Sequence, residues 1–201
     1  MTRIRFCLRW LVLGAVLANV LLLAPVVAQP VIPPVWDIVA DTFESGSLDG
    51  WEISGTYSPY LSAGNGRSGS TGLAVPMGQG NGYIYQSGVS RSEEGYLTFW
   101  YNPNNAVIPD VFPSWPPGNS ICVASIVSTE YWWPPLVALY VRYETGVGYR
   151  GFISWAEGEN SHWDYDNEFA IANGWQKVTM GYHIDEWSAI WIDDQLTRYN
   201  D

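Results

Sequence analysis

The stretch Asp41-Thr42-Phe43-Glu44-Ser45-Gly46-Ser47-Leu48-Asp49-Gly50-Trp51 decides the fold, together with Ser68-Gly69-Ser70-Thr71-Gly72-Leu73-Ala74-Val75. Residues 42–44 are predicted to end a first strand over 36–43, because Gly46 and Gly50 then break the chain into a loop. Trp51 is predicted to begin the next strand. Residues 64–70 are rich in Gly, Asn and Ser, which favour turns. Residues 73–77 alternate as in a strand with one buried face, so the stretch predicts short strands joined by tight turns.

Alternating residues continue through the rest of the chain and predict further strands. The clearest lie at 94–101, 120–127, 136–144, 175–184 and 187–192. Asp193-Asp194 is predicted to form a tight hairpin turn, with Leu196 on the returning strand. Few segments show a helical period with a capping signal, so the predicted class is all-β with little helix.

The N-terminal segment has the pattern of a secretory signal peptide. Three arginines precede an apolar run over residues 10–23, and Val26-Val27-Ala28 offers a cleavage site after Ala28. This predicts a secreted or extracytoplasmic protein with no membrane span after cleavage, the alternative being a retained membrane anchor. Residues 29–35 are predicted to be a Pro-rich linker, and 36–201 a single domain.

The charge of the chain restricts its partners. The full sequence carries 9 basic and 20 acidic residues, and removing 1–28 takes three arginines and no acid, which leaves a net charge of −14. Nucleic acid and anionic membranes are poor partners for such a surface, whereas uncharged glycans, cationic surfaces and calcium are compatible with it. Cys122 is the only cysteine after residue 28, so the predicted mature chain cannot form an internal disulfide, and its apolar neighbours predict a buried thiol.

Several motifs together resemble the laminin-G-like and concanavalin A-like jelly-roll domains of exported bacterial proteins. Such domains often begin with Phe-Glu-x-Gly-x-Leu-x-x-Trp, which matches 43–51, and continue with Ser-Gly-x-x-Gly-Leu, which matches 68–73. Later, 174–178 match their Gly-Trp-x-x-Val strand, and Trp191-Ile192-Asp193-Asp194 stands where they have Trp-Ile-Asp-Gly. The resemblance implies a two-sheet antiparallel β-sandwich of jelly-roll type. Such domains also close with a further strand beside the first. The sequence stops at Asp201, so we expect this strand to be missing here, either because the sequence is truncated or because the sandwich has one uncovered edge, which would be open to self-association.

The resemblance also implies a possible structural calcium site. Related jelly rolls often hold calcium beside their opening Phe-Glu and Ser-Gly segments, where Asp41 and Glu44 stand here. Calcium prefers six to eight oxygen ligands, which these carboxylates and nearby loop carbonyls could supply. The alternative interpretation is that Glu44 faces solvent at a strand end. Zinc is not expected, because the chain has two histidines and no ligand spacing.

The resemblance also raises the alternative of a glycosidase, because related jelly rolls include glucanases. Glycoside hydrolysis needs two opposed carboxylates. If 164–168 were extended, Asp164, Asp166 and Glu168 would share one face, but their types and spacing miss the glucanase signature. We interpret them as solvated loop acids, and Asp185-Glu186 as a turn. Gly-x-Ser-x-Gly and a phosphate-binding loop are both absent from the sequence, so no enzyme is predicted.

Two proline-bounded loops carry the aromatic residues predicted to bind carbohydrate, which are Trp115, Tyr131, Trp132 and Trp133. Aromatic walls with a few polar groups are typical of small-molecule sites. The same rings could instead cap the end of a sandwich, because tryptophan is mostly buried. The predicted function is non-catalytic recognition of a glycan or cell-surface polysaccharide. A structural or adhesive module without a sugar site is the alternative, and a glucanase-like hydrolase is third.

Overall fold

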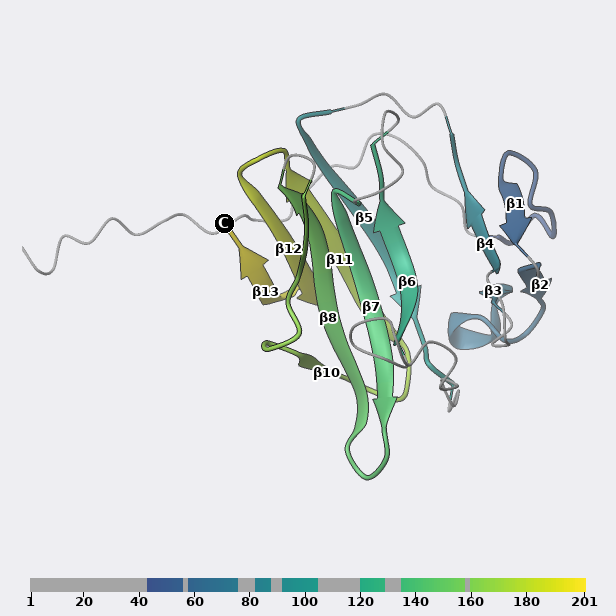
Figure 1. Cartoon of the computed structure of the whole chain (residues 1–201). Helices are drawn as coiled ribbons and strands as arrows, with labels where there is room; N and C mark the ends of the chain where they lie inside the picture. Colours follow the sequence, from purple (N-terminus) through teal and green to yellow (C-terminus); the bar gives the residue numbers. More distant parts are fainter. Residues whose placement is uncertain are drawn as a thin grey trace, which may run out of the picture. The chain divides into compact units, whose positions relative to one another are not determined.

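The computed structural model describes residues 43–55, 58–75, 82–87, 92–104, 120–128, 135–157 and 160–201. The predicted signal peptide, the linker and nearly all of the predicted first strand lie outside these residues. Apart from one short 3-10 helix, η1 (Arg67–Gly69), the regular structure in the described ranges consists of strands. All of the pairings between them are antiparallel, which confirms the all-β prediction (Figure 1).

A five-stranded sheet forms one layer of the fold. Its strands are β6 (Ser120–Ile126), β7 (Val137–Glu144), β8 (Gly148–Glu157), β9 (Asn160–Trp163) and β10 (Phe169–Ile171). The order is β10-β8-β7-β6, and β9 also pairs with β8. The strand predicted over 136–144 is therefore confirmed. After residue 160 the chain forms the two short strands β9 and β10, which are separated by a turn.

A four-stranded sheet forms the second layer. It contains β5 (Glu94–Tyr101), β11 (Gln176–His183), β12 (Trp187–Ile192) and β13 (Gln195–Asn200), in the order β13-β12-β11-β5. Asp193 and Asp194 connect the last two strands with φ angles of 49° and 64°. Both lie in the left-handed region that tight hairpin turns require, so the predicted turn is confirmed. The N–H and ammonium of Lys177 bind these two carboxylates at 2.9 and 2.8 Å.

The two sheets pack face to face through one hydrophobic core. Alternate residues of β7, such as Val137, Leu139 and Val141, are fully buried in the same cluster as Val178 and Met180 of β11. Since successive side chains of a strand point to opposite faces, this fixes one inner and one outer face for each sheet. The antiparallel β-sandwich is thus confirmed, and the jelly-roll type stays a prediction.

Two small sheets precede this sandwich in sequence. One pairs β1 (Glu52–Gly55) with β4 (Gly82–Tyr85), and the other pairs β2 (Tyr60–Ser62) with β3 (Gly72–Ala74). The prediction that Phe43 and Glu44 end a strand is wrong. Phe43 has a φ of 58° and begins a turn that is closed by the bond from the Gly46 N–H to its carbonyl. The left-handed backbone is incompatible with a strand.

In the main sheets, three glycines each lie directly across from an aromatic residue on the neighbouring strand. The pairs are Gly95 with Tyr182, Gly151 with Phe169, and Gly181 with Tyr96. A Cβ added to any of these glycines would lie within 2.9 Å of the paired ring. The absence of a side chain therefore allows each ring to lie down on the neighbouring strand.

Candidate functional site

The outer face of the four-stranded sheet carries a group of aromatic rings. Tyr96 and Trp100 come from β5, and Trp187 and Trp191 come from β12. Alternation places all four opposite the core, since Leu97, Phe99 and Ile190 between them pack inward. We call these four rings the open aromatic face.

Three of these rings contact one another. The Tyr96 ring centroid lies 5.9 Å from that of Trp187 and 6.0 Å from that of Trp191, and the two indoles meet edge to face at 6.5 Å. These distances fall in the range of favourable aromatic pairs. Trp191 is only 3% exposed and forms the base of the group, whereas Tyr96 and Trp187 are partly exposed. The arrangement holds two rings firmly while leaving part of each accessible.

Trp100 lies further along β5 and is 39% exposed. The guanidinium carbon of Arg67 lies 3.5 Å from its ring centroid, which is a cation–π contact between η1 and β5. Between Trp100 and Tyr96, the hydroxyls of Thr98 and Thr179 are hydrogen-bonded at 2.9 Å. Thr179 is only 1% exposed, so this hydroxyl pair joins β5 to β11 within the sheet.

Acidic groups surround one end of the open aromatic face. The Tyr96 hydroxyl donates a hydrogen bond to the Glu94 carboxylate. Burial, and secondly this bond, raise the pKa of Tyr96 above its usual range, so its hydroxyl stays neutral at physiological pH. His183 Nδ1 lies 3.3 Å from Glu186 Oε2 at the same end. These groups can exchange hydrogen bonds with a polar ligand.

The outer face of the five-stranded sheet carries a second aromatic group, which we call the covered aromatic face. It consists of Tyr140, Phe152, Trp163 and Tyr165. Trp163 lies 4.9 Å from Tyr140, and Tyr165 lies 5.3 Å from Phe152, between ring centroids. Phe152 is fully buried and Tyr140 nearly so. This group therefore serves packing, since its central rings are closed to solvent.

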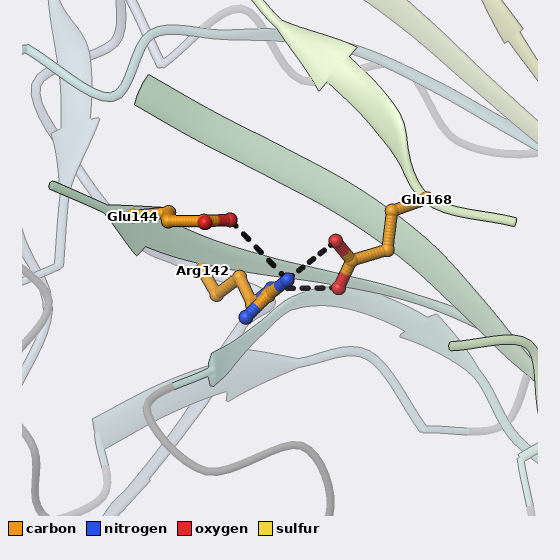
Figure 2. A network of polar contacts seen from close by, with 3 residues as sticks. All are labelled: Arg142, Glu144 and Glu168. Atoms are coloured by element: carbon orange, nitrogen blue, oxygen red, sulfur yellow. Dashed lines mark hydrogen bonds and ion pairs between the residues drawn. The ribbon is translucent and has the colours of Figure 1, made fainter. Parts of the chain in front are cut away.

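Two arginines hold the segment that covers this face. Arg142 of β7 forms a bidentate ion pair with Glu168, with Nε–Oε1 and Nη2–Oε2 distances of 2.6 and 2.7 Å, and also approaches Glu144 at 3.5 Å (Figure 2). Asp164 pairs with Arg198 of β13 and accepts a bond from the Asn167 amide at 2.8 Å. Residues 164–168, which we call the strap, are thereby fixed to both sheets.

The strap corrects one prediction. Asp164 and Glu168 were interpreted as solvated loop acids, but Asp164 is 8% exposed and both are paired with arginine. They also bind different strands, so they do not share a face. Only Asp166 is exposed as predicted. Local sequence does not reveal these pairs, because each partner is more than 25 residues away.

The other predicted residues have mixed outcomes. Trp115, Tyr131, Trp132, Trp133 and Asp41 lie outside the described residues. The Glu44 carboxylate accepts a bond from the Thr71 N–H at 2.8 Å, which brings it beside the 64–70 loop. In the described ranges, no group of three or more His, Cys, Asp or Glu side chains could hold a metal ion. The calcium site stays a prediction.

Two further sequence interpretations can be compared with the structure. Asp185 has a φ of 56° and lies in the turn between β11 and β12, as predicted. Cys122 lies on the outer side of β6, opposite Tyr140. The residue as a whole is exposed, yet burial raises the pKa of its thiol to about 11.

Comparisons with protein-family models, with curated proteins and with solved structures found no match. In the part of the chain that the structure describes, no helix has the length and apolar character needed to cross a bilayer. Any function of the candidate site must therefore be inferred from the geometry of its residues. The signal for Tyr96 and Trp187 was available in sequence, because each occupies the outward position of a predicted strand.

Proposed function

We propose that the protein is a secreted, non-catalytic recognition module that binds carbohydrate on the open aromatic face. The observation that carries this proposal is the pair of partly exposed rings, Tyr96 and Trp187, in contact with each other above the buried Trp191. We also propose that the β-sandwich is a jelly roll of the concanavalin A-like and laminin-G-like type that the sequence motifs resemble.

The chemistry of the face suits a sugar. The C–H groups of a pyranose pack against aromatic rings, and its hydroxyls need donors and acceptors nearby. Tyr96 and Trp187 offer ring surface, and the Glu94 carboxylate beside them offers polar atoms. Trp100 lies four residues along β5 from Tyr96, about 13 Å at the usual strand rise, and its ring is occupied by Arg67, so the sugar surface is centred on Tyr96 and Trp187.

The proposal of a binding role is supported by how the acids are used. Hydrolysis by two carboxylates requires an acid and a base on either side of one bond. Asp164 and Glu168 instead each form an ion pair with an arginine that holds the strap. The positions of these two carboxylates are explained by their ion pairs, which stabilise the strap.

Binding to soluble neutral polysaccharides, measured by affinity electrophoresis and calorimetry, tests this function. We expect Trp187→Ala to weaken binding roughly fivefold, as loss of about 1 kcal/mol of aromatic contact predicts. Tyr143→Ala is the matched control, because Tyr143 is an exposed ring on the other sheet. Thermal unfolding of each variant checks that it is folded.

Two outcomes would overturn the proposal: no binding to any neutral glycan, or equal binding by wild type and Trp187→Ala. The double variant Trp132→Ala, Trp133→Ala separates the loop rings predicted from sequence from the sheet face. If only that variant loses binding, the sugar site lies in the loop and the open aromatic face is excluded.

A further inference from the structure

The ribbon formed by β1 and β4 presents a second aromatic surface, unconnected in sequence with the open aromatic face. In the ribbon Glu52 pairs with Tyr85, and Ser54 with Tyr83, so these four side chains share one side. Tyr83 and Tyr85 are 51% and 40% exposed, with ring centroids 6.0 Å apart and planes inclined by 42°. We call this surface the tyrosine ribbon face.

A carboxylate lies beside the two rings. Glu52 Oε2 accepts a hydrogen bond from the Tyr85 hydroxyl at 2.8 Å, and Oε1 accepts one from Ser87 Oγ at 2.5 Å. The bond from Ser87, and then that from Tyr85, lower the pKa of Glu52, so the carboxylate is ionised at neutral pH. The same bond to Glu52 raises the pKa of Tyr85, so both groups keep the protonation states that the bond requires.

Within the described ranges, this face has no cation of its own. Glu52 forms no ion pair there, and no Lys or Arg lies over Tyr83 or Tyr85. Neither strand of the ribbon contains a basic residue. Trp100 shows the opposite case, because Arg67 already lies on its ring. At Trp100 a cation of the protein itself occupies the ring, whereas within the described ranges no protein cation occupies the rings of the ribbon.

We propose that the tyrosine ribbon face binds an alkylated ammonium group, such as the trimethylammonium of choline. Two ring faces attract a cation through their quadrupoles, and the Glu52 carboxylate adds an opposite charge. Both carboxylate oxygens already accept hydrogen bonds from the protein. The face therefore favours a cation that brings no N–H donors over a primary ammonium, which needs three acceptors.

The charge of the whole chain agrees with such a ligand. The formal net charge is −11, which raises the local concentration of small cations around the protein. This inference is independent of the proposed sugar binding, since it uses another sheet and another interaction. If either sugar binding or cation binding is found to be absent, the proposal of the other is unaffected.

Ligand-observed NMR titrations with choline, and with 3,3-dimethylbutan-1-ol as its uncharged isostere, test the inference on the unmodified protein. We expect saturable binding of choline in the millimolar range and at least about twofold weaker binding of the alcohol, as an exposed cation–π contact predicts. Methylammonium is the third probe and is expected to bind more weakly than choline. No choline binding, equal binding of the alcohol, or methylammonium binding as tight as choline would overturn the assignment.

Variants locate the site. Tyr83→Ala and Glu52→Gln are each expected to weaken choline binding about two- to fivefold. Tyr85→Phe keeps the ring and removes only the hydroxyl, so it should retain most of the affinity. Tyr60→Ala is the matched control, because Tyr60 is 54% exposed on the other two-stranded sheet. Equal loss in Tyr60→Ala and Tyr83→Ala would show that binding is not specific to this face and would contradict the proposal.

Discussion

The two main sheets carry aromatic rings on both outer faces, but the chain treats these faces differently. On the five-stranded sheet, the rings of Trp163 and Tyr165 lie over Tyr140 and Phe152, and the strap holds them there through two ion pairs. On the four-stranded sheet, Tyr96 and Trp187 remain partly exposed. Both faces set partly exposed rings above a buried one, and the difference lies in the strap, which two arginines hold on the five-stranded sheet.

The largest expected effect comes from releasing the strap. Asp164→Ala removes two interactions. Arg198, an inward-facing cation at the edge of the sandwich, loses its ion-pair partner, and the Asn167 amide loses its acceptor. Removing one member of a buried pair typically costs 3–5 kcal/mol, and the partial exposure of Arg198 reduces this to roughly 2–3 kcal/mol of unfolding free energy. Urea denaturation measures it.

The exposed Asp166 in the same strap provides the control. Asp166→Ala should change the free energy of unfolding by less than about 0.5 kcal/mol. If both alanine variants were equally stable, the ion pair would not be what holds the covered face closed.

A methyl group placed beneath the open aromatic face gives the next effect. In Gly181→Ala the new Cβ would lie 2.9 Å from two carbons of the Tyr96 ring and 3.1 Å from Trp191 Cζ3, so the rings must move. Overpacking of this kind costs about 1–3 kcal/mol. Thermal unfolding measures the cost, and sugar binding should weaken along with it, because Tyr96 is displaced.

Gly174→Ala is the matched control, since a Cβ at Gly174 meets nothing within 4 Å. We expect it to be neutral or slightly stabilising. A Gly181→Ala protein as stable as Gly174→Ala would mean that the rings do not rest on this glycine.

The smallest effect concerns alkaline pH and the covered face. Burial raises the pKa of Tyr165 from its usual value of 10.0 to about 12. Because the folded state binds this proton more tightly, the contribution to stability is complete below pH 10 and is lost as the pH rises from about 10 to about 12. Tyr165→Phe should therefore show a shallower loss of stability in this window.

Denaturation at pH 9 and at successive higher pH values measures this slope. At pH 9 the two proteins should differ little, because the ring is retained. Identical slopes in wild type and Tyr165→Phe would show that the Tyr165 hydroxyl is not buried in the folded protein.

The fold class was predictable because its signals are local. Alternation over 136–144 and 187–192 identified β7 and β12 closely, and the acidic pair at 193–194 identified a turn. The predictions failed where distant partners decide the structure. The local sequence around Asp164 and Glu168 is typical of loop acids. Only the fold brings Arg198 beside Asp164 and Arg142 beside Glu168.

The candidate site was predictable in part. Alternation along the predicted strands 94–101 and 187–192 is consistent with Trp100 and Trp191 lying on the outer side of a sheet, as both do. Their grouping with Tyr96 and Trp187 was missed, because it depends on the register between β5, β11 and β12. Alternation indicates the face on which a side chain lies, but only register indicates which side chains meet.

The glycines that lie under aromatic rings have a spectroscopic consequence. A proton held against the face of a ring experiences the ring current, which moves its resonance away from the usual position. Gly95, Gly151 and Gly181 each lie beneath the ring of a residue on the next strand. The α-proton signals of these three glycines therefore report directly on strand alignment in solution, and they would reveal a slipped pairing before any loss of folded protein.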